Sequence, residues 1–314
     1  QPMSEEFHRQ VTEPFASLEL LASQVVEGFI TGLHKSPFHG FSVEFAEHRQ
    51  YNQGESVRHV DWKLYGRTDR LYVKKYQEET NLRCHILVDT SSSMCFPAAG
   101  FQGNTLDKLG FSFCSAAVLA TMLIRQRDAA GLRFFSSEED FKTEVKSSRT
   151  HLKYLLSELE SRLGRTLASP RLDVESGIVP ALHLAAEQIH KRSLVVLFSD
   201  MFDGLADPEG LWGALQHLKY RDNEVLLFQV THHGTEASLD FPWKRCRMVD
   251  MESGREIKIS PARYRQAYVE KYDVFRQELV NRCNRYGIDL VQADVADGFV
   301  PVLQAYMAKR RKVF

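Results

Sequence analysis

Short apolar runs alternate with segments of helical periodicity from residue 83 to residue 230. The runs are CHILV at 84–88, GLRFF at 131–135, LVVLF at 194–198 and EVLLFQV at 224–230. Such runs between helices predict parallel strands, because the helices of this kind of fold bury both faces of the sheet. We therefore expect an α/β fold with a doubly wound, Rossmann-like sheet, helices on both faces and a ligand site at the carboxyl ends of the strands.

The helices between these runs are indicated by apolar residues at three- and four-residue spacing. Thr105 is expected to cap the first helix, with Asp107 in its first turn. The apolar run 109–124 is shorter than the ~20 residues that span a bilayer. It is therefore expected to be a buried core helix, and no membrane span is predicted. The remaining helices are expected near residues 150–163, 176–189 and 208–220.

Additions are expected on both sides of this sheet domain. Pro14 and the apolar spacing after it predict a helix over residues 14–33. Beyond the sheet domain the pattern predicts a hairpin at 246–259, a long helix from Pro261 to a stop at Gly287, a strand at 288–295 and a helix ending at 309–312. The chain is thus divided into an N-terminal segment 1–80, a sheet domain 81–240 and a C-terminal segment 241–314 that packs on the core.

Charge and cysteine content disfavour several classes of protein. The 40 Lys and Arg against 41 Asp and Glu give a net charge of −1, which argues against a protein that coats nucleic acid or an anionic membrane. The five cysteines are scattered and form no CxxC pair, so free thiols are expected rather than disulfides or a zinc site. The opening segment is polar and acidic rather than a secretion signal, so a cytoplasmic protein is expected.

Hydroxyl and carboxyl side chains follow the first apolar run. In HILVDTSSSM, Asp89, Ser91 and Ser93 follow the strand with D-x-S-x-S spacing. The loop after a strand is where a doubly wound fold binds its ligand, and this spacing brings three hard oxygen groups together. Oxygen ligands completed by water suit Mg²⁺, with Mn²⁺ and Ca²⁺ as alternatives. These residues therefore predict a divalent-cation site.

A second carboxylate, Asp200, follows the LVVLF run. In a doubly wound sheet it can lie beside Asp89 across the switch point of the strand order, which favours a shared metal site. The simpler interpretation is that Asp200 caps the next turn, because Asp is common in turns.

These features resemble the von Willebrand factor A domain and its metal-ion-dependent adhesion site. In that family a D-x-S-x-S loop, a Thr from a second loop and an Asp from a third surround a divalent cation. The resemblance assigns the first element to Asp89, Ser91 and Ser93 and the third to Asp200. Where the family has its Thr before a helix, ESGIVPALHLAA has Ser176, which keeps the hydroxyl; Thr166 is the alternative.

The segment before the sheet is similar to the signature of the bacterial domain-of-unknown-function family 58, which joins such a region to a von Willebrand-like domain. The departures are mild: Glu55 stands where Asp is usual and Gly66 where Ala is usual. The resemblance implies a functional link with MoxR-type AAA+ ATPases. The matching residues are Gly40, Glu44, Phe45, Glu47, Arg49, Tyr51, Gly54, Arg58, Asp61, Trp62 and Arg67.

The charges and aromatic residues between positions 49 and 79 have two interpretations. One is a network of ion pairs that docks the N-terminal part onto the sheet domain. The other is a partner-recognition surface, since Arg, Tyr and Trp are enriched in interfaces. The candidate partner-binding residues are Arg49, Tyr51, Arg58, Asp61, Trp62 and Arg67.

Two classes of function are compatible with these residues. The first is a non-enzymatic, metal-dependent protein-interaction module, in which a partner's Asp or Glu carboxylate fills an open position on the metal. The resemblance implies that such a module acts with a MoxR-type ATPase in complex assembly or chaperone-like activation. The alternative is a metal-dependent phosphohydrolase with Asp89 as nucleophile. Those enzymes use a second carboxylate two residues on, where this chain has Ser91.

Overall fold

Two compact units make up the chain, Phe38–Leu82 and the combination of Gln1–Pro37 with Arg83–Phe314. We call them the smaller and the larger unit. The boundaries expected near residues 81 and 240 stay a prediction. The computed structural model describes residues 17–32, 47–50, 62–68, 71–75, 82–97, 106–137, 139–168, 177–241, 245–252 and 254–311.

The smaller unit contains a short hairpin and a helix. Strand β1 (Glu47–Gln50) pairs antiparallel with β2 (Tyr72–Lys75). Helix α3 (Trp62–Thr68) lies between them in the sequence. On this helix the rings of Trp62 and Tyr65 meet edge to face, with centroids 6.1 Å apart.

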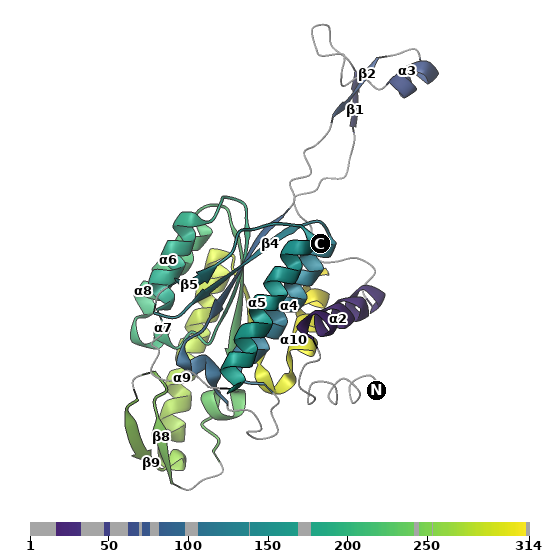
Figure 1. Cartoon of the computed structure of the whole chain (residues 1–314). Helices are drawn as coiled ribbons and strands as arrows, with labels where there is room; N and C mark the ends of the chain where they lie inside the picture. Colours follow the sequence, from purple (N-terminus) through teal and green to yellow (C-terminus); the bar gives the residue numbers. More distant parts are fainter. Residues whose placement is uncertain are drawn as a thin grey trace. The chain divides into compact units, whose positions relative to one another are not determined.

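A six-stranded sheet is the centre of the larger unit (Figure 1). Its order is β10-β7-β6-β3-β4-β5, and all neighbours are parallel except β4 and β5. The predicted α/β class is confirmed, but the sheet is mixed rather than entirely parallel. The strands are β3 (Arg83–Asp89), β4 (Ala129–Phe135), β5 (Glu139–Lys142), β6 (Leu194–Ser199), β7 (Glu224–Thr231) and β10 (Asp289–Asp294).

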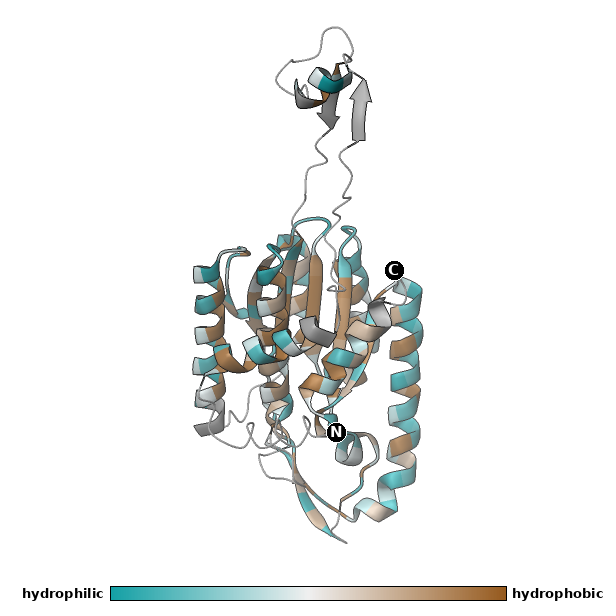
Figure 2. Ribbon diagram, turned by 90° about the vertical axis from the view of Figure 1, so that its right-hand side faces the viewer, coloured by the Kyte–Doolittle hydropathy of each residue, from teal (hydrophilic) through white to brown (hydrophobic). Residues whose placement is uncertain are grey.

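Burial explains which strands the sequence predicts. Every residue of β6, and every residue of β3 except Arg83, is buried, as parallel strands covered on both faces require. The antiparallel edge strand β5 has the sequence EDFK with alternating exposure, so it contains no apolar run. Figure 2 shows the apolar strands between helices whose outer faces are hydrophilic.

Helices cover the two faces of the sheet in separate groups. Helix α4 packs with α2, α5 and α10, whereas α6 packs with α8, and α8 with α7 and α9. Within the described residues, these helices are α2 (Leu18–Gly32), α4 (Lys108–Arg125), α5 (Arg149–Ala168), α6 (Ile178–Gln188), α7 (Asp203–Ala206), α8 (Pro208–Lys219), α9 (Pro261–Tyr286) and α10 (Phe299–Arg311).

Helix α4 is the core helix that the apolar run predicts. All its residues from Lys108 to Ile124 are buried. By length and composition α4 could cross a membrane, but 94% of the relevant window is buried inside the protein. Its cap is Asp107, whose carboxylate accepts a hydrogen bond from the Gly110 N–H at 2.6 Å. Asp107 thus holds the capping position expected for Thr105, which lies outside the described residues.

The segment after β7 contributes the last strand of the sheet. A hairpin of β8 (Cys246–Val249) and β9 (Glu256–Ile259) precedes α9. Helix α9 ends at the predicted glycine, because Gly287 has φ 65° and adopts the left-handed conformation of a helix stop. Strand β10 then pairs in parallel with β7. The expected hairpin, long helix, strand and final helix are therefore all present.

The strand order reverses between β3 and β6. From β3 the chain passes through α4 to β4 on one side, whereas β6 and β7 lie on the other side. Helices α4 and α8 consequently cover opposite faces. The carboxyl ends of β3 and β6 define the switch point where folds of this class bind ligands.

Candidate functional site

Asp89 is the last residue of β3 and is fully buried. The register pairs Val88 with Phe198, so Asp89 reaches the end of the neighbouring strand β6. There the Ser199 hydroxyl donates to Asp89 Oδ2 at 2.8 Å. The backbone N–H of Ser91 donates to Oδ1 at 3.0 Å. Both carboxylate oxygens are thus oriented at the switch point.

The loop after Asp89 brings the two predicted hydroxyl ligands together. The Oγ atoms of Ser91 and Ser93 are 3.1 Å apart. Thr90 anchors the loop, since its N–H donates to the Phe135 carbonyl at 2.7 Å. Its hydroxyl lies within hydrogen-bond distance of the same carbonyl and of the Asp140 carboxylate. The D-x-S-x-S loop is therefore held against the end of β4.

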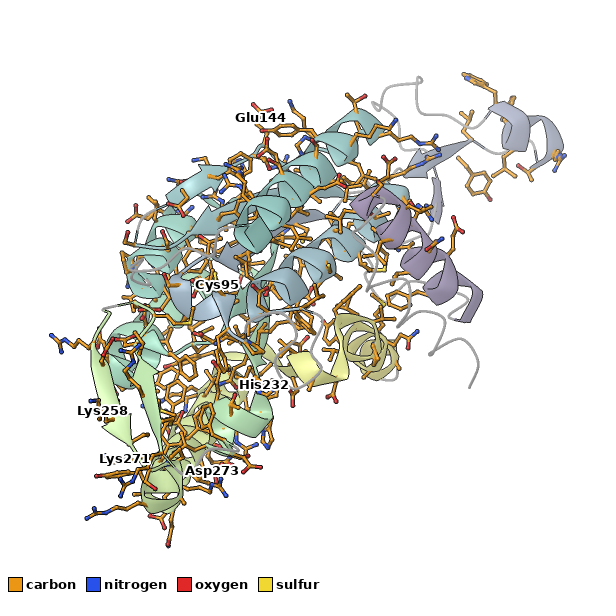
Figure 3. The ribbon with its side chains drawn as sticks, turned by 60° about the horizontal axis from the view of Figure 1, so that its bottom comes forward. Cys95, Glu144, His232, Lys258, Lys271 and Asp273 are labelled. Atoms are coloured by element: carbon orange, nitrogen blue, oxygen red, sulfur yellow. The ribbon has the colours of Figure 1, made fainter. Side chains whose placement is uncertain are left out.

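A short 3₁₀ turn, η2 (Ser92–Cys95), carries the loop back to the core. The ring of Phe96 after it meets His232 edge to face at 6.2 Å, which links the loop to the end of β7. Figure 3 brings this edge of the sheet forward, with Cys95 among the interior side chains and Lys258 projecting outward from β9. All five cysteines are free thiols, as expected, and four of them are buried.

Asp200, directly after β6, is also buried. Its Oδ1 accepts the Phe202 N–H at 3.1 Å, and its Oδ2 lies 2.7 Å from the ammonium of Lys108. Met201, between them, has φ 64°, a left-handed conformation that is unusual for such a side chain. This turn points the Met201 N–H at the Ser199 hydroxyl, at 3.0 Å. Asp200 is thus close to Asp89, but both of its oxygens already have partners.

Lys108, the first residue of α4, is fully buried and joins two carboxylates. Besides Asp200 it contacts Oε1 of Glu236 at 2.5 Å. Glu236 lies in η4 (His233–Ala237), a π-helical turn after β7. The ammonium also stands 4.8 Å from the centre of the Phe202 ring. The sequence gives only a weak signal for this cluster, because a lysine that flanks an apolar helix resembles an ordinary solvated helix end.

The electrostatics of the site reflect buried negative charge. Burial, together with the nearby Asp200 carboxylate, raises the pKa of Asp89 to about 7, against the hydrogen bonds from Ser91 and Ser199. Burial likewise raises the pKa of Glu236 to about 7, although the Lys108 ammonium acts to lower it. Burial acts to lower the pKa of Lys108, but the carboxylates of Asp200 and Glu236 raise it above its ordinary value. The ammonium is therefore the stable form of Lys108 in this cluster.

The second-loop candidates are only partly described. Ser176 lies outside the described residues, and Thr166 falls in α5 with a side chain that is not described. The next residues, however, reach the same edge of the sheet. The N–H of Ile178, at the start of α6, donates to the Asp203 carboxylate at 3.3 Å, just beyond β6. The assignment of either hydroxyl to the site stays a prediction.

The partner-binding candidates belong to the smaller unit. Trp62 is 60% exposed and Arg67 is also exposed, both on α3. Arg49 lies in β1, and its side chain is outside the described set. The other three candidates, Tyr51, Arg58 and Asp61, lie outside the described residues. An exposed Trp62 ring is compatible with the recognition surface.

The side chains of the D-x-S-x-S loop determine which kind of metal ion could bind there. In the described part of the chain, no group of three or more His, Cys, Asp or Glu side chains could hold a metal. The candidate donors are instead Asp89 with the hydroxyls of Ser91 and Ser93. One buried carboxylate beside two hydroxyls fits a hard cation that keeps several of its waters. This set does not suit zinc, because His and Cys ligands are missing among these donors.

A family model described as "Protein of unknown function DUF58" matches residues 47–278. The chain belongs to this family. Uncharacterized proteins from Mycobacterium bovis and Mycobacterium tuberculosis are 22% identical to the DUF58 chain over 298 residues, which cover 94% of it and 88% of each relative.

Some solved structures are similar to the DUF58 chain. One is the conserved hypothetical protein BatB from Bacteroides thetaiotaomicron, with a TM-score of 0.40 and 14% identity. The match covers 74% of this chain and 100% of that one. An aerotolerance-related membrane protein from Bacteroides fragilis has TM-score 0.43 and 14% identity, with the same coverage. A mutant of the PilB minor pilin from Streptococcus sanguinis has TM-score 0.42 and 9% identity, over 78% of this chain and 64% of that one.

Proposed function

We propose that this protein is a divalent-cation-dependent protein-binding module with a von Willebrand factor A-like sheet domain. Asp89, Ser91 and Ser93 hold the cation, and Ser176 supplies the second-loop hydroxyl. A partner donates an Asp or Glu carboxylate to the open position on the cation. The partner system is a MoxR-type AAA+ ATPase, with which the protein acts in complex assembly or chaperone-like activation. The protein catalyses no reaction in this role.

The observation that carries the proposal is the place and packing of Asp89. Its carboxylate is fully buried at the switch point and lies in the same loop as two hydroxyls that are 3.1 Å apart. Burying an ionised carboxylate has a large desolvation cost. A cation bound here would balance this charge, and the hydroxyls would replace part of its water shell.

A site of this composition favours Mg²⁺, with Mn²⁺ as its experimental substitute. A single carboxylate ligand and several hydroxyls leave water molecules on the ion, as Mg²⁺ prefers, whereas Ca²⁺ takes six to eight oxygen ligands. The remaining positions on the ion are then exchangeable. A partner carboxylate can displace one water, and its negative charge makes that exchange favourable.

The phosphohydrolase alternative has less support. The position two residues after Asp89 carries a hydroxyl in place of the acid. Turnover of phosphoesters with Mg²⁺ that is lost in Asp89→Asn would favour the enzyme over the binding module.

The proposal is tested by cation binding and by partner capture with the full chain. Mn²⁺ titration calorimetry should detect one site in the wild type and none in Asp89→Ala. Capture of a MoxR-type ATPase on the immobilised chain should require Mg²⁺ and be lost with EDTA or with Asp89→Ala. Asp222→Asn is the matched control, because Asp222 is an exposed residue just before β7, at the opposite edge of the sheet. Capture that is unchanged in EDTA would contradict the proposal.

A further inference from the structure

The larger unit buries a complete lysine side chain in the region of the proposed metal site. Lys108 has no exposed surface and lies at the start of an otherwise apolar helix. A buried ammonium is unfavourable unless it is paired and hydrogen-bonded. Here it is paired twice, with Asp200 at 2.7 Å and with Glu236 at 2.5 Å.

The carboxylates around Lys108 are held in place by their own contacts. Oε2 of Glu236 accepts the His232 N–H at 2.8 Å, while the Tyr268 hydroxyl of α9 donates to the Glu236 carbonyl at 2.6 Å. Asp200 is fixed by the turn after β6. The two carboxylates therefore come from rigid positions after neighbouring strands, and Lys108 lies between them.

The charges of this group can be counted. Asp89, Asp200 and Glu236 contribute three negative charges when ionised, and Lys108 contributes one positive charge, which leaves −2. One divalent cation at Asp89 would make the group neutral. Without Lys108 the cation-loaded group would keep a net charge of −1 and would repel an incoming carboxylate.

We propose that Lys108 is a built-in cation that occupies the Asp200–Glu236 carboxylate pair and thereby confines the exchangeable divalent cation to the Asp89 loop. This inference rests on the proposed function and deepens it. Lys108 is a positioning residue: it withholds Asp200 from direct contact with the metal. It also keeps the metal-loaded site neutral, so that the site does not repel an anionic partner group.

The decisive variant is Lys108→Met/Glu236→Gln, which removes one positive and one negative charge together. The group's net charge stays at −2, while Asp200, which stays buried, loses its ammonium partner. With Oδ2 of Asp200 free, the cation gains a second carboxylate, and Mn²⁺ affinity should rise at least about tenfold, since affinity follows the number of charged ligands. Adding Asp200→Asn to this variant should abolish the gain.

Calorimetry with Mn²⁺ alone, on the full chain, separates the outcomes. One outcome is that the wild type binds Mn²⁺ and Lys108→Met/Glu236→Gln binds it with equal or weaker affinity. This result overturns the role of Lys108 and leaves the proposed function standing. Binding by this variant alone overturns the proposed function but supports the blocking role of Lys108. A gain that persists after Asp200→Asn also overturns the inference, because the new ligand would then not be Asp200.

Thermal unfolding provides a second readout that does not depend on partner binding. In EDTA the single variant Lys108→Met should unfold at a lower temperature than the wild type, because two buried carboxylates lose their ammonium. Mn²⁺ should raise the unfolding temperature of Lys108→Met by more than it raises that of the wild type, since the ion can replace the ammonium between Asp200 and Glu236. The same Mn²⁺ response in Lys108→Met and in the wild type would overturn the inference.

Discussion

The hydroxyl of Ser199 donates a hydrogen bond to Oδ2 of Asp89 at 2.8 Å. This hydrogen bond connects the last residues of β6 and β3 across the switch point. This bond joins the two strands that carry the candidate carboxylates. It also fixes the rotation of the Asp89 side chain before any ligand arrives. A preoriented carboxylate binds a cation without losing further side-chain entropy.

Removal of the Asp89 charge should leave stability equal or higher without a divalent cation, and should abolish the stability gained when the cation is present. In EDTA, Asp89→Asn should be at least as stable as the wild type. The amide oxygen can accept the Ser91 N–H, its NH2 can donate to the Ser199 hydroxyl, and a buried charge is removed. With Mg²⁺ the wild type should gain stability by binding linkage, whereas the variant should gain none. Chemical unfolding of both proteins, once in EDTA and once in Mg²⁺, measures how much stability each gains from the cation. Equal Mg²⁺ responses in the two proteins would contradict the expectation.

The contribution of Thr90 to anchoring the D-x-S-x-S loop should be measurable. Thr90→Val removes a hydroxyl that lies 2.9 Å from the Phe135 carbonyl and 3.1 Å from Asp140, so stability should fall by about 1–2 kcal/mol. Thr121→Val is the matched control. The Thr121 hydroxyl is buried without a hydrogen-bond partner among the described residues, so its loss should be neutral or slightly stabilising. Urea unfolding measures the free energy of unfolding of both variants. Equal losses in Thr90→Val and Thr121→Val would contradict an anchoring role of the Thr90 hydroxyl.

The approach of α6 to the end of β4 depends on a glycine without a side chain. A Cβ at Gly177 would lie 2.8 Å from the Ser136 carbonyl and 2.9 Å from the Ser137 carbonyl, both backbone atoms. Gly177→Ala should therefore cost about 1–3 kcal/mol of unfolding free energy. In contrast, Gly213→Ala in α8 meets nothing within 4 Å and should stabilise the helix by up to about 1 kcal/mol. If both substitutions were neutral, the close approach would be refuted.

His85 should make stability depend on pH. Burial lowers the pKa of His85 to about 3, assisted by the positive charges of Arg133, His190 and Arg83. The unfolded chain, with the ordinary pKa near 6.5, binds this proton more readily than the folded protein does. Stability should thus be lost as the pH falls below about 6.5, with a slope approaching 1.4 kcal/mol per pH unit. His85→Leu should remove this contribution, and parallel pH profiles for the two proteins would contradict it.

The sheet and the first loop could be predicted because local sequence determines them. Runs such as LVVLF are uniformly apolar, and the alternation with helices implies the switch point where Asp89 and Asp200 come together. Strand β5 could not be found in this way, since EDFK at an edge has no apolar run. Capping by Asp107 rather than Thr105 depends on where the helix starts, which composition alone does not determine.

The ion cluster could not be predicted from the sequence for a different reason. Lys108 and Glu236 are 128 positions apart, and their contact exists because α4, which starts at Lys108, packs against β7, which Glu236 follows. Ser199 likewise acquires its role from the strand register. Residues that complete a site through tertiary contacts have no local pattern of their own, whereas the D-x-S-x-S loop has one.

The position of α10 has a consequence for the biosynthesis of the protein. Helix α4 is covered by α2 and α10, and α10 follows every strand of the sheet in the sequence. During translation, the apolar surface of α4 that α10 covers must stay open until residues 299–311 have left the ribosome. Chaperones or proteases should bind nascent chains at this stage, because the exposed apolar surface of α4 promotes aggregation. The same should hold for chains cleaved before Phe299.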